Sequence, residues 1–122
     1  MLADKLYADV PAGTTGVVVW YRIGAGLPER IGQVLPVAGY DEKTFDIIYA
    51  VGATGTIRVE ANEGDVEDAD EWYTIADGAT TTSKVIEDSQ TRTHIRVYAE
   101  SIATAGVEIK AMLATEPGHP HR

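Results

Sequence analysis

The chain has 122 residues, no cysteine, 44% hydrophobic residues and 24% charged residues. This length and balance predict one globular domain rather than a disordered chain, held together by neither disulfides nor thiolate metal sites. The net charge of −9, from 19 acidic and 10 basic residues, disfavours nucleic acid and anionic lipid as partners. Both of those partners need clustered Lys and Arg side chains.

Neither a leader peptide nor a membrane anchor is indicated by the N-terminal residues. Asp4 and Lys5 stand where a leader peptide has its apolar core, and no apolar run approaches the ~20 residues that span a bilayer. We therefore expect synthesis in the cytoplasm and no membrane partner.

Alternation of apolar and polar residues recurs along the chain, whereas no long segment has helical spacing. Residues 14–23, TTGVVVWYRI, are β-branched and aromatic, so they predict a strand whose centre is buried on both faces. A Gly- and Pro-rich segment follows, with a short strand predicted at 31–37 and a strong one at 44–51. In residues 56–61, TIRVEA, the alternation places on one face Ile57, Val59 and Ala61.

The second half of the chain predicts four further strands. Residues 71–75 and 80–86 flank Asp77-Gly78, a dipeptide typical of a two-residue hairpin turn. Residues 93–113 contain the last two strands, separated by small residues. Their core-facing residues are predicted to be Ile95, Val97, Ala99, Val107, Ile109, Ala111 and Leu113.

Short strands at intervals of about ten residues, with turn residues between them, are typical of an antiparallel sandwich. We therefore predict an all-β fold, a single antiparallel β-sandwich or jelly-roll-like domain at residues 14–114. A flexible N-terminal arm at 1–13 and a flexible polar tail at 115–122 are predicted to flank it.

A row of polar residues, His94, Arg96 and Glu100, with the aromatic Tyr98 among them, lies on the outer face of the predicted strand that begins near Thr93. A catalytic histidine needs a nucleophile or a carboxylate positioned by a third group. None of the serines at 83, 89 and 101 stands in a G-x-S-x-G turn. The row is therefore interpreted as a solvated or interface face, and no catalytic or cofactor-binding residue is assigned.

An acidic run, EANEGDVEDADE at residues 60–71, has seven acidic residues among twelve. Calcium needs several convergent oxygen ligands, which Asp65, Glu67 and Asp70 supply in part, but their spacing does not match an EF-hand loop. The paired acids of a glycoside hydrolase come from separate elements rather than from one loop. A solvated hairpin loop is the preferred interpretation, and no metal ligand is assigned in this loop or at His119 and His121 in the tail.

Two aromatic pairs, Trp20-Tyr21 and Trp72-Tyr73, lie on predicted strands. Because neighbouring strand residues face opposite ways, we expect one ring of each pair in the core and the other outside. An exposed ring is suited to stacking on a sugar or to anchoring a protein contact, and a loop that covers the ring is the alternative.

Residues 55–78 and 93–113 together form one pattern of strands and loops. A strand leads into an acidic or Gly-rich loop and then the motif W-x-x-I. A Thr-rich connection follows, then x-I-R-V-x-A and a closing V-x-I-x-A-x-L strand. Together with VPAGTTGVVVW at 10–20, this pattern resembles small β-sandwich virion proteins of tailed bacteriophages. The likeness covers residues 55–113 best and rests on the order of strands and loops rather than on an invariant motif. The long acidic loop departs from the short Asp-Gly turn of that pattern.

The resemblance implies a non-enzymatic virion structural protein of the capsid decoration (cement) or head-fibre type, on the capsid surface after synthesis in the host cytoplasm. It implies as partners the major capsid protein of the same virion and further copies of the chain, with a homotrimer favoured. It implies no cofactor, nucleic acid or membrane. The candidate contacts are an arm at 11–16 that adds a strand to a partner's sheet, a loop at 24–40 and the outer rows of the last two strands.

A carbohydrate-binding or host-recognition β-sandwich module of a tail or fibre apparatus is the alternative function. Its site would be formed by Trp72 or Tyr73 together with the acidic loop, with or without calcium. Fold alone does not separate the two functions, because sites of different kinds are carried by the same folds.

Overall fold

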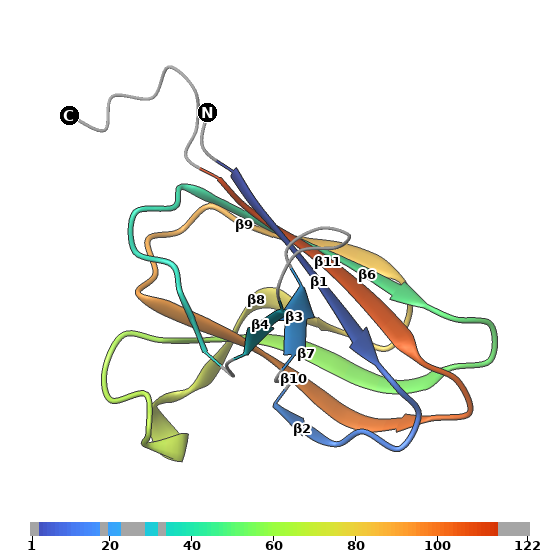
Figure 1. Cartoon of the computed structure of the whole chain (residues 1–122). Helices are drawn as coiled ribbons and strands as arrows, with labels where there is room; N and C mark the ends of the chain where they lie inside the picture. Colours follow the sequence, from blue (N-terminus) through green and yellow to red (C-terminus); the bar gives the residue numbers. More distant parts are fainter. Residues whose placement is uncertain (1–2, 18–19, 23–28, 32–33, 115–122) are drawn as a thin grey trace.

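The computed structural model describes residues 3–17, 20–22, 29–31 and 34–114, which form two antiparallel sheets packed face to face (Figure 1). One sheet has six strands in the order β4-β3-β1-β11-β6-β9. The other has the order β2-β10-β7-β8, with β5 also paired to β10. The all-β sandwich predicted from the alternation of apolar and polar residues is confirmed.

The strands of the six-stranded sheet are β1 (Ala3–Val10), β3 (Trp20–Arg22), β4 (Glu29–Ile31), β6 (Glu42–Tyr49), β9 (Lys84–Asp88) and β11 (Val107–Ala114). Those of the second sheet are β2 (Gly16–Val17), β5 (Leu35–Pro36), β7 (Thr54–Asn62), β8 (Tyr73–Thr80) and β10 (His94–Ala103). One turn of 3-10 helix, η1 (Ala69–Glu71), lies between β7 and β8. Within these described ranges, no helix has the length and apolar character needed to cross a bilayer.

The core lies between the two sheets and comes from alternate residues of the long strands. All seven residues predicted to face the core on the last two strands are buried, and Ile57, Val59 and Ala61 of β7 are 0% exposed. Phe45 and Ile47 of β6 are also fully buried and face them from the other sheet. Burying an aliphatic or aromatic side chain of this size contributes roughly 1.5–3 kcal/mol, so this alternating set is the main source of stability.

The hairpin predicted at Asp77-Gly78 is wrong. Both residues lie inside β8, which pairs with β7, whereas β9 pairs with β6 in the opposite sheet. Asp77 has a φ of 57°, and the pairing register between β7 and β8 shifts beside it. A Cβ on Gly78 would lie 2.8 Å from the carbonyl oxygen of Ile75, so glycine is required there for an irregularity of the strand rather than for a turn.

The arm predicted at residues 1–13 is wrong for most of its length. Ala3–Val10 form β1, an inner strand that pairs with β11 in unbroken register from Ala3↔Ala114 to Val10↔Val107. Ala8 and Val10 are both 2% exposed and belong to the core. The sequence signal was weak because Asp4, Lys5 and Asp9 interrupt the apolar residues of this segment. The predicted tail at 115–122 lies outside the described residues.

The strand predicted at 14–23 is split, since β2 joins one sheet and β3 joins the other. The short strand predicted at 31–37 is likewise divided between β4 and β5. A continuous apolar run therefore marked a crossover between the two layers rather than one doubly buried strand. Leu35 and Val37 still enter the core, at 1% and 0% exposure.

The sandwich has two unlike ends. The turns between β1 and β2, β6 and β7, β8 and β9, and β10 and β11 gather at one end, on the right of Figure 1. The acidic loop between β7 and β8, the β9–β10 loop and both described chain ends lie at the other end. Antiparallel pairing throughout the sandwich produces this separation.

Removal of residues 1–13 is expected to abolish folding rather than to leave an intact β core. The truncation takes Ala8 and Val10 from the core and leaves β11 and β3 without the strand between them. Circular dichroism and thermal unfolding check this, with the full-length chain as control. A truncated protein that melts in the same cooperative transition contradicts the structural role of β1.

Candidate functional site

The polar row on β10 is joined to matching charges on the neighbouring strand β7. Arg96 stands opposite Glu60 in the pairing register, and its Nε lies 2.7 Å from Glu60 Oε1. Arg58 donates from Nη1 to Glu100 Oε2 at 2.8 Å and lies 3.7 Å from Glu60 through Nε. These cross-strand pairs satisfy one another on the outer face of the second sheet.

Aromatic rings cover both guanidinium groups of this row. The Arg96 guanidinium carbon lies 4.3 Å from the centre of the Trp72 ring, and that of Arg58 lies 4.8 Å from the Tyr98 ring. Stacking of this kind is favourable for a cation held over an aromatic face. The charged groups and aromatic rings of this row therefore already bind one another through ion pairs and cation–π contacts.

His94 stands at the start of β10 and is half-buried. Its Nδ1 lies 3.2 Å from the hydroxyl of Thr93, which itself donates to the carbonyl of Asn62 at 2.8 Å. Ser83 and Ser101 lie at the opposite end of the sandwich, where Ser83 Oγ accepts from the Tyr49 amide. Across the described ranges, no serine hydroxyl is hydrogen-bonded to His94. These hydrogen bonds join the start of β10 to the end of β7 and do not form a catalytic arrangement.

The acidic loop is held in shape by its own backbone and by Asn62. The side chain of Asn62, 0% exposed, accepts from Gly64 N at 2.6 Å and donates to the carbonyl of Asp65 at 2.9 Å. Asp65 and Asp68 each accept a backbone N–H two residues ahead, at 2.9 Å, and Asp68 thereby caps η1. In the part of the chain that the structure describes, no three Asp, Glu or His side chains gather to hold a metal ion.

Trp72 is buried under this loop. It is 9% exposed, its Nε1 donates to the carbonyl of Val66 at 3.0 Å, and Arg96 lies over its ring. Tyr73 is 40% exposed, so one ring of this pair is covered and the other is not, but the prediction that one ring lies in the core is wrong. The covered ring, however, lies on the outer side of the sheet beneath the loop and not between the two sheets. The side chains of Trp20 and Tyr21 lie outside the described residues.

A second cluster, which sequence reasoning missed, joins the two sheets near the acidic end. Lys43 on β6 is 0% exposed, donates to the carbonyl of Gln90 at 2.7 Å and lies 3.6 Å from Asp88. Arg92 binds both oxygens of Asp88, at 3.0 and 3.1 Å, and donates to the hydroxyl of Tyr73 at 2.9 Å. The Tyr73 hydroxyl in turn donates to Glu63 of the acidic loop.

The pKa values in this cluster follow from burial and charge. Burial lowers the pKa of Lys43, against the attraction of Asp88. For Asp88, burial raises the pKa, but the hydrogen bonds from Arg92 and the charge of Lys43 outweigh it and hold the pKa below the ordinary value. Burial and the bond to Glu63 raise the pKa of Tyr73. The cluster is thus an ionised, buried link between sheets.

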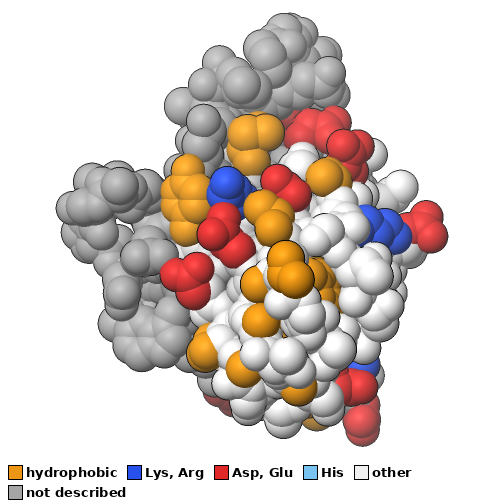
Figure 2. Space-filling model, turned by 90° about the vertical axis from the view of Figure 1, so that its right-hand side faces the viewer, with side chains coloured by type: hydrophobic (Ala, Val, Ile, Leu, Met, Phe, Trp, Pro, Cys, Tyr) orange, Lys and Arg blue, Asp and Glu red, His pale blue; other side chains and the backbone are white. Residues whose placement is uncertain are grey.

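The four described turns at the end of the sandwich opposite the acidic loop carry no charged residue. This neutral end comprises residues 11–16, 50–56, 79–83 and 101–107, none of which is Asp, Glu, Lys, Arg or His. Figure 2 faces this end and shows white and hydrophobic atoms in its lower centre, with charged side chains above and to the left of them and at the margins. At its tip, Val51 is fully exposed. Such a surface is unusual on a chain of net charge −9.

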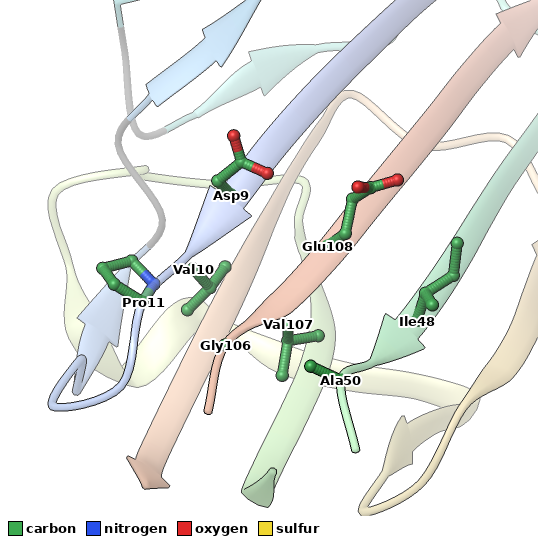
Figure 3. A pocket seen from close by; sticks show the side chains of 8 residues that line it. All are labelled: Asp9, Val10, Pro11, Ile48, Ala50, Gly106, Val107 and Glu108. Carbon is green, nitrogen blue, oxygen red and sulfur yellow. The ribbon is translucent and has the colours of Figure 1, made fainter. Parts of the chain in front are cut away.

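An open hollow of about 300 Å³ lies at the border of the neutral end (Figure 3). Its apolar wall comes from Val10, Pro11, Ile48, Ala50 and Val107, together with Gly106. Asp9 and Glu108 lie on one side of it, on neighbouring strands β1 and β11. The hollow has the form of a contact surface more than of an enclosed ligand cavity.

A further open hollow of about 510 Å³ lies beside the acidic loop, between Val34, Glu67, Ala69 and the Trp72–Arg96 stack. Its aromatic ring faces Arg96 and is therefore already covered on that side. The candidate contacts predicted at 11–16 belong to the neutral end. Those predicted at 24–40 are described only at 29–31 and from residue 34 onward.

No protein-family model and no curated protein matches this sequence. Among solved structures, the chain is similar to the crystal structure of the SPBc2 prophage-derived protein YomS, with a TM-score of 0.51 and 12% sequence identity. The match covers 93% of this chain and 95% of that one. At this level of identity, the likeness shows a shared β-sandwich fold over nearly the whole length of both proteins.

Replacing the buried carboxylate by an amide, Asp88→Asn, is expected to destabilise the protein by about 3–5 kcal/mol at neutral pH, because Lys43 and Arg92 lose their shared counter-charge. The folded pKa of Asp88 is lowered, so its contribution is complete above the unfolded pKa of about 3.9 and declines as the pH falls below it. Urea unfolding at several pH values should show the difference between wild type and variant shrinking in that acidic range.

The exposed neighbour Glu87 on the same strand provides the control, and Glu87→Gln should change the free energy of unfolding by less than about 0.5 kcal/mol. An Asp88→Asn variant as stable as wild type at neutral pH would contradict the role of the cluster.

Removing the guanidinium that joins Glu60 to Trp72, Arg96→Ala, is expected to lower the free energy of unfolding by about 1–3 kcal/mol. Glu60, 8% exposed, loses its nearest donor, and one face of the indole loses its cover. Glu100→Gln, whose side chain is 48% exposed, is the control and should stay within about 0.5 kcal/mol of wild type. Equal effects of the two substitutions in chemical denaturation would argue against the linked row.

Proposed function

We propose that this chain is a non-enzymatic structural protein of a bacteriophage virion, a decoration protein that binds the shell of major capsid protein and stabilises it. The observation that carries the proposal is the fold shared with the prophage-derived protein YomS over 93% of this chain. The order of strands and loops that resembles small phage virion proteins supports the same class from the sequence side.

The surfaces of the sandwich suit adhesion. The charged side chains of the polar row on β10 form ion pairs with side chains of β7. The hollows among the described residues are open. A partner can cover the neutral end and its exposed Val51 without the energetic cost of removing charged groups from water. These features support binding to a large partner surface better than turnover of a small substrate.

Multivalency strengthens such binding. A capsid presents the same site many times, so an oligomer that engages several sites gains effective concentration even when each contact is modest. We therefore propose a homo-oligomer on the shell, with the trimer that the sequence resemblance favours as its form.

The structure offers less support for a carbohydrate-binding module. The Trp72 ring is covered by Arg96 on one face, and its N–H is bonded to Val66. Tyr73 remains 40% exposed, but its hydroxyl already joins Glu63 and Arg92. A sugar platform needs an open aromatic face with polar partners available around it, and these two rings do not combine both properties.

Co-sedimentation with purified empty capsids of the phage or prophage that encodes this chain tests the proposal. We expect binding that saturates at a fixed ratio to the capsid protein, together with a higher temperature of capsid disruption. The matched probe is a glycan array, on which we expect no signal. Absence of capsid binding, with glycan binding that Tyr73→Ala removes, would instead favour the module.

A further inference from the structure

The neutral end is assembled from four turns that are fixed to one another. Gly13 N donates to the carbonyl of Ile102 at 2.7 Å, Ala50 N to that of Gly106 at 3.1 Å, and the Tyr49 hydroxyl to that of Thr80 at 2.9 Å. Their exposed side chains are mostly small, such as Ala, Thr and Val. Ordering this surface on binding therefore loses little conformational entropy, which favours its use as a docking surface.

A protrusion and a hollow lie side by side on this surface. The turn from Ala50 to Ala53 is closed by a hydrogen bond of 2.9 Å and raises Val51 to full exposure. The neighbouring hollow of about 300 Å³ shares Ala50 with that turn and is lined mainly by apolar side chains. The exposed valine of one copy therefore has the shape and apolar character to fit the hollow of a second copy.

We propose that the neutral end is a self-association surface, on which Val51 of one copy enters the hollow of the next copy. Reciprocal exchange closes a dimer, and cyclic exchange closes a trimer through a different rotation between the copies. A second copy is the occupant that the charge distribution favours. Two molecules that each carry −9 repel one another at their acidic surfaces, and the neutral end is where they meet without opposing acids at its centre.

The orientation agrees with this assignment. Ala3 and Ala114 pair at the far end of the sandwich, beside the acidic loop. Contact through the neutral end keeps both described chain ends and the acidic loop away from the partner copy. The inference concerns self-association of the protein and does not depend on capsid binding, so a failure to self-associate is distinguishable from a failure to bind capsids.

Sedimentation velocity of the full-length chain over a concentration series tests the inference. We expect a reversible oligomer, and we expect Val51→Asp to weaken association by about tenfold or more, because it removes the apolar anchor and introduces facing negative charges. Val85→Asp is the matched control, since Val85 is 50% exposed on β9 and lies outside the neutral end. This control should associate as wild type does, and circular dichroism should show that both variants are folded.

Val51→Ser separates the apolar contact from charge. It leaves the net charge of −9 unchanged, so repulsion alone predicts no change in association, whereas loss of the valine contact predicts weaker association. Raising the ionic strength from about 0.01 M to 0.15 M should strengthen wild-type association, because it screens the repulsion between acidic molecules. A wild-type chain that stays monomeric throughout the series, or a Val51→Asp variant that associates as wild type does, overturns the inference.

Discussion

The pairing of β1 with β11 is the constraint on which the arrangement of this molecule depends. It joins the first and last described strands residue by residue and places β1 inside the six-stranded sheet. Because Ala3 pairs with Ala114, both described chain ends lie at one end of the sandwich, and the turns that follow β1 and precede β11 lie at the other. The antiparallel pairing of β7 with β10, from Asn62↔His94 to Thr54↔Ala103, places the acidic loop and the neutral turns at opposite ends in the same way.

Sequence patterns predicted the long strands well where burial alone decides the residue type. Ile57, Val59 and Ala61 alternate strictly with polar residues, and the structure buries all three. The same patterns gave wrong predictions where backbone geometry, rather than burial, decides the residue type. Gly78 lies at an irregularity within β8, where a Cβ would meet Ile75 of the same strand, and β1 was missed because charged residues interrupt its apolar ones. Short-range signals such as Asp-Gly do not reveal which sheet the next strand joins.

The candidate surfaces were foreseeable only in part, because their partners are distant in the chain. The alternation placed Arg96 outside the core, but nothing local pairs it with Glu60, 36 residues away. Lys43 is a charged residue on a strand, and only the fold shows that Asp88 and Arg92 surround it. Asn62 carried a usable signal, since an Asn that precedes a Gly by two residues often organises a turn.

The uncharged segments of this sequence form one continuous surface only in the folded protein. The uncharged stretches at 11–16, 50–56, 79–83 and 101–107 look like four unrelated turns, each built from Gly, Ala, Thr and their like for local reasons. Antiparallel strands of similar length bring the four to the same end, where lack of charge becomes a property of a surface. Stability does not require that surface, because exposed turns tolerate Lys and Glu readily. The lack of charge in all four turns of a chain this acidic is therefore the observation on which the proposed self-association surface rests.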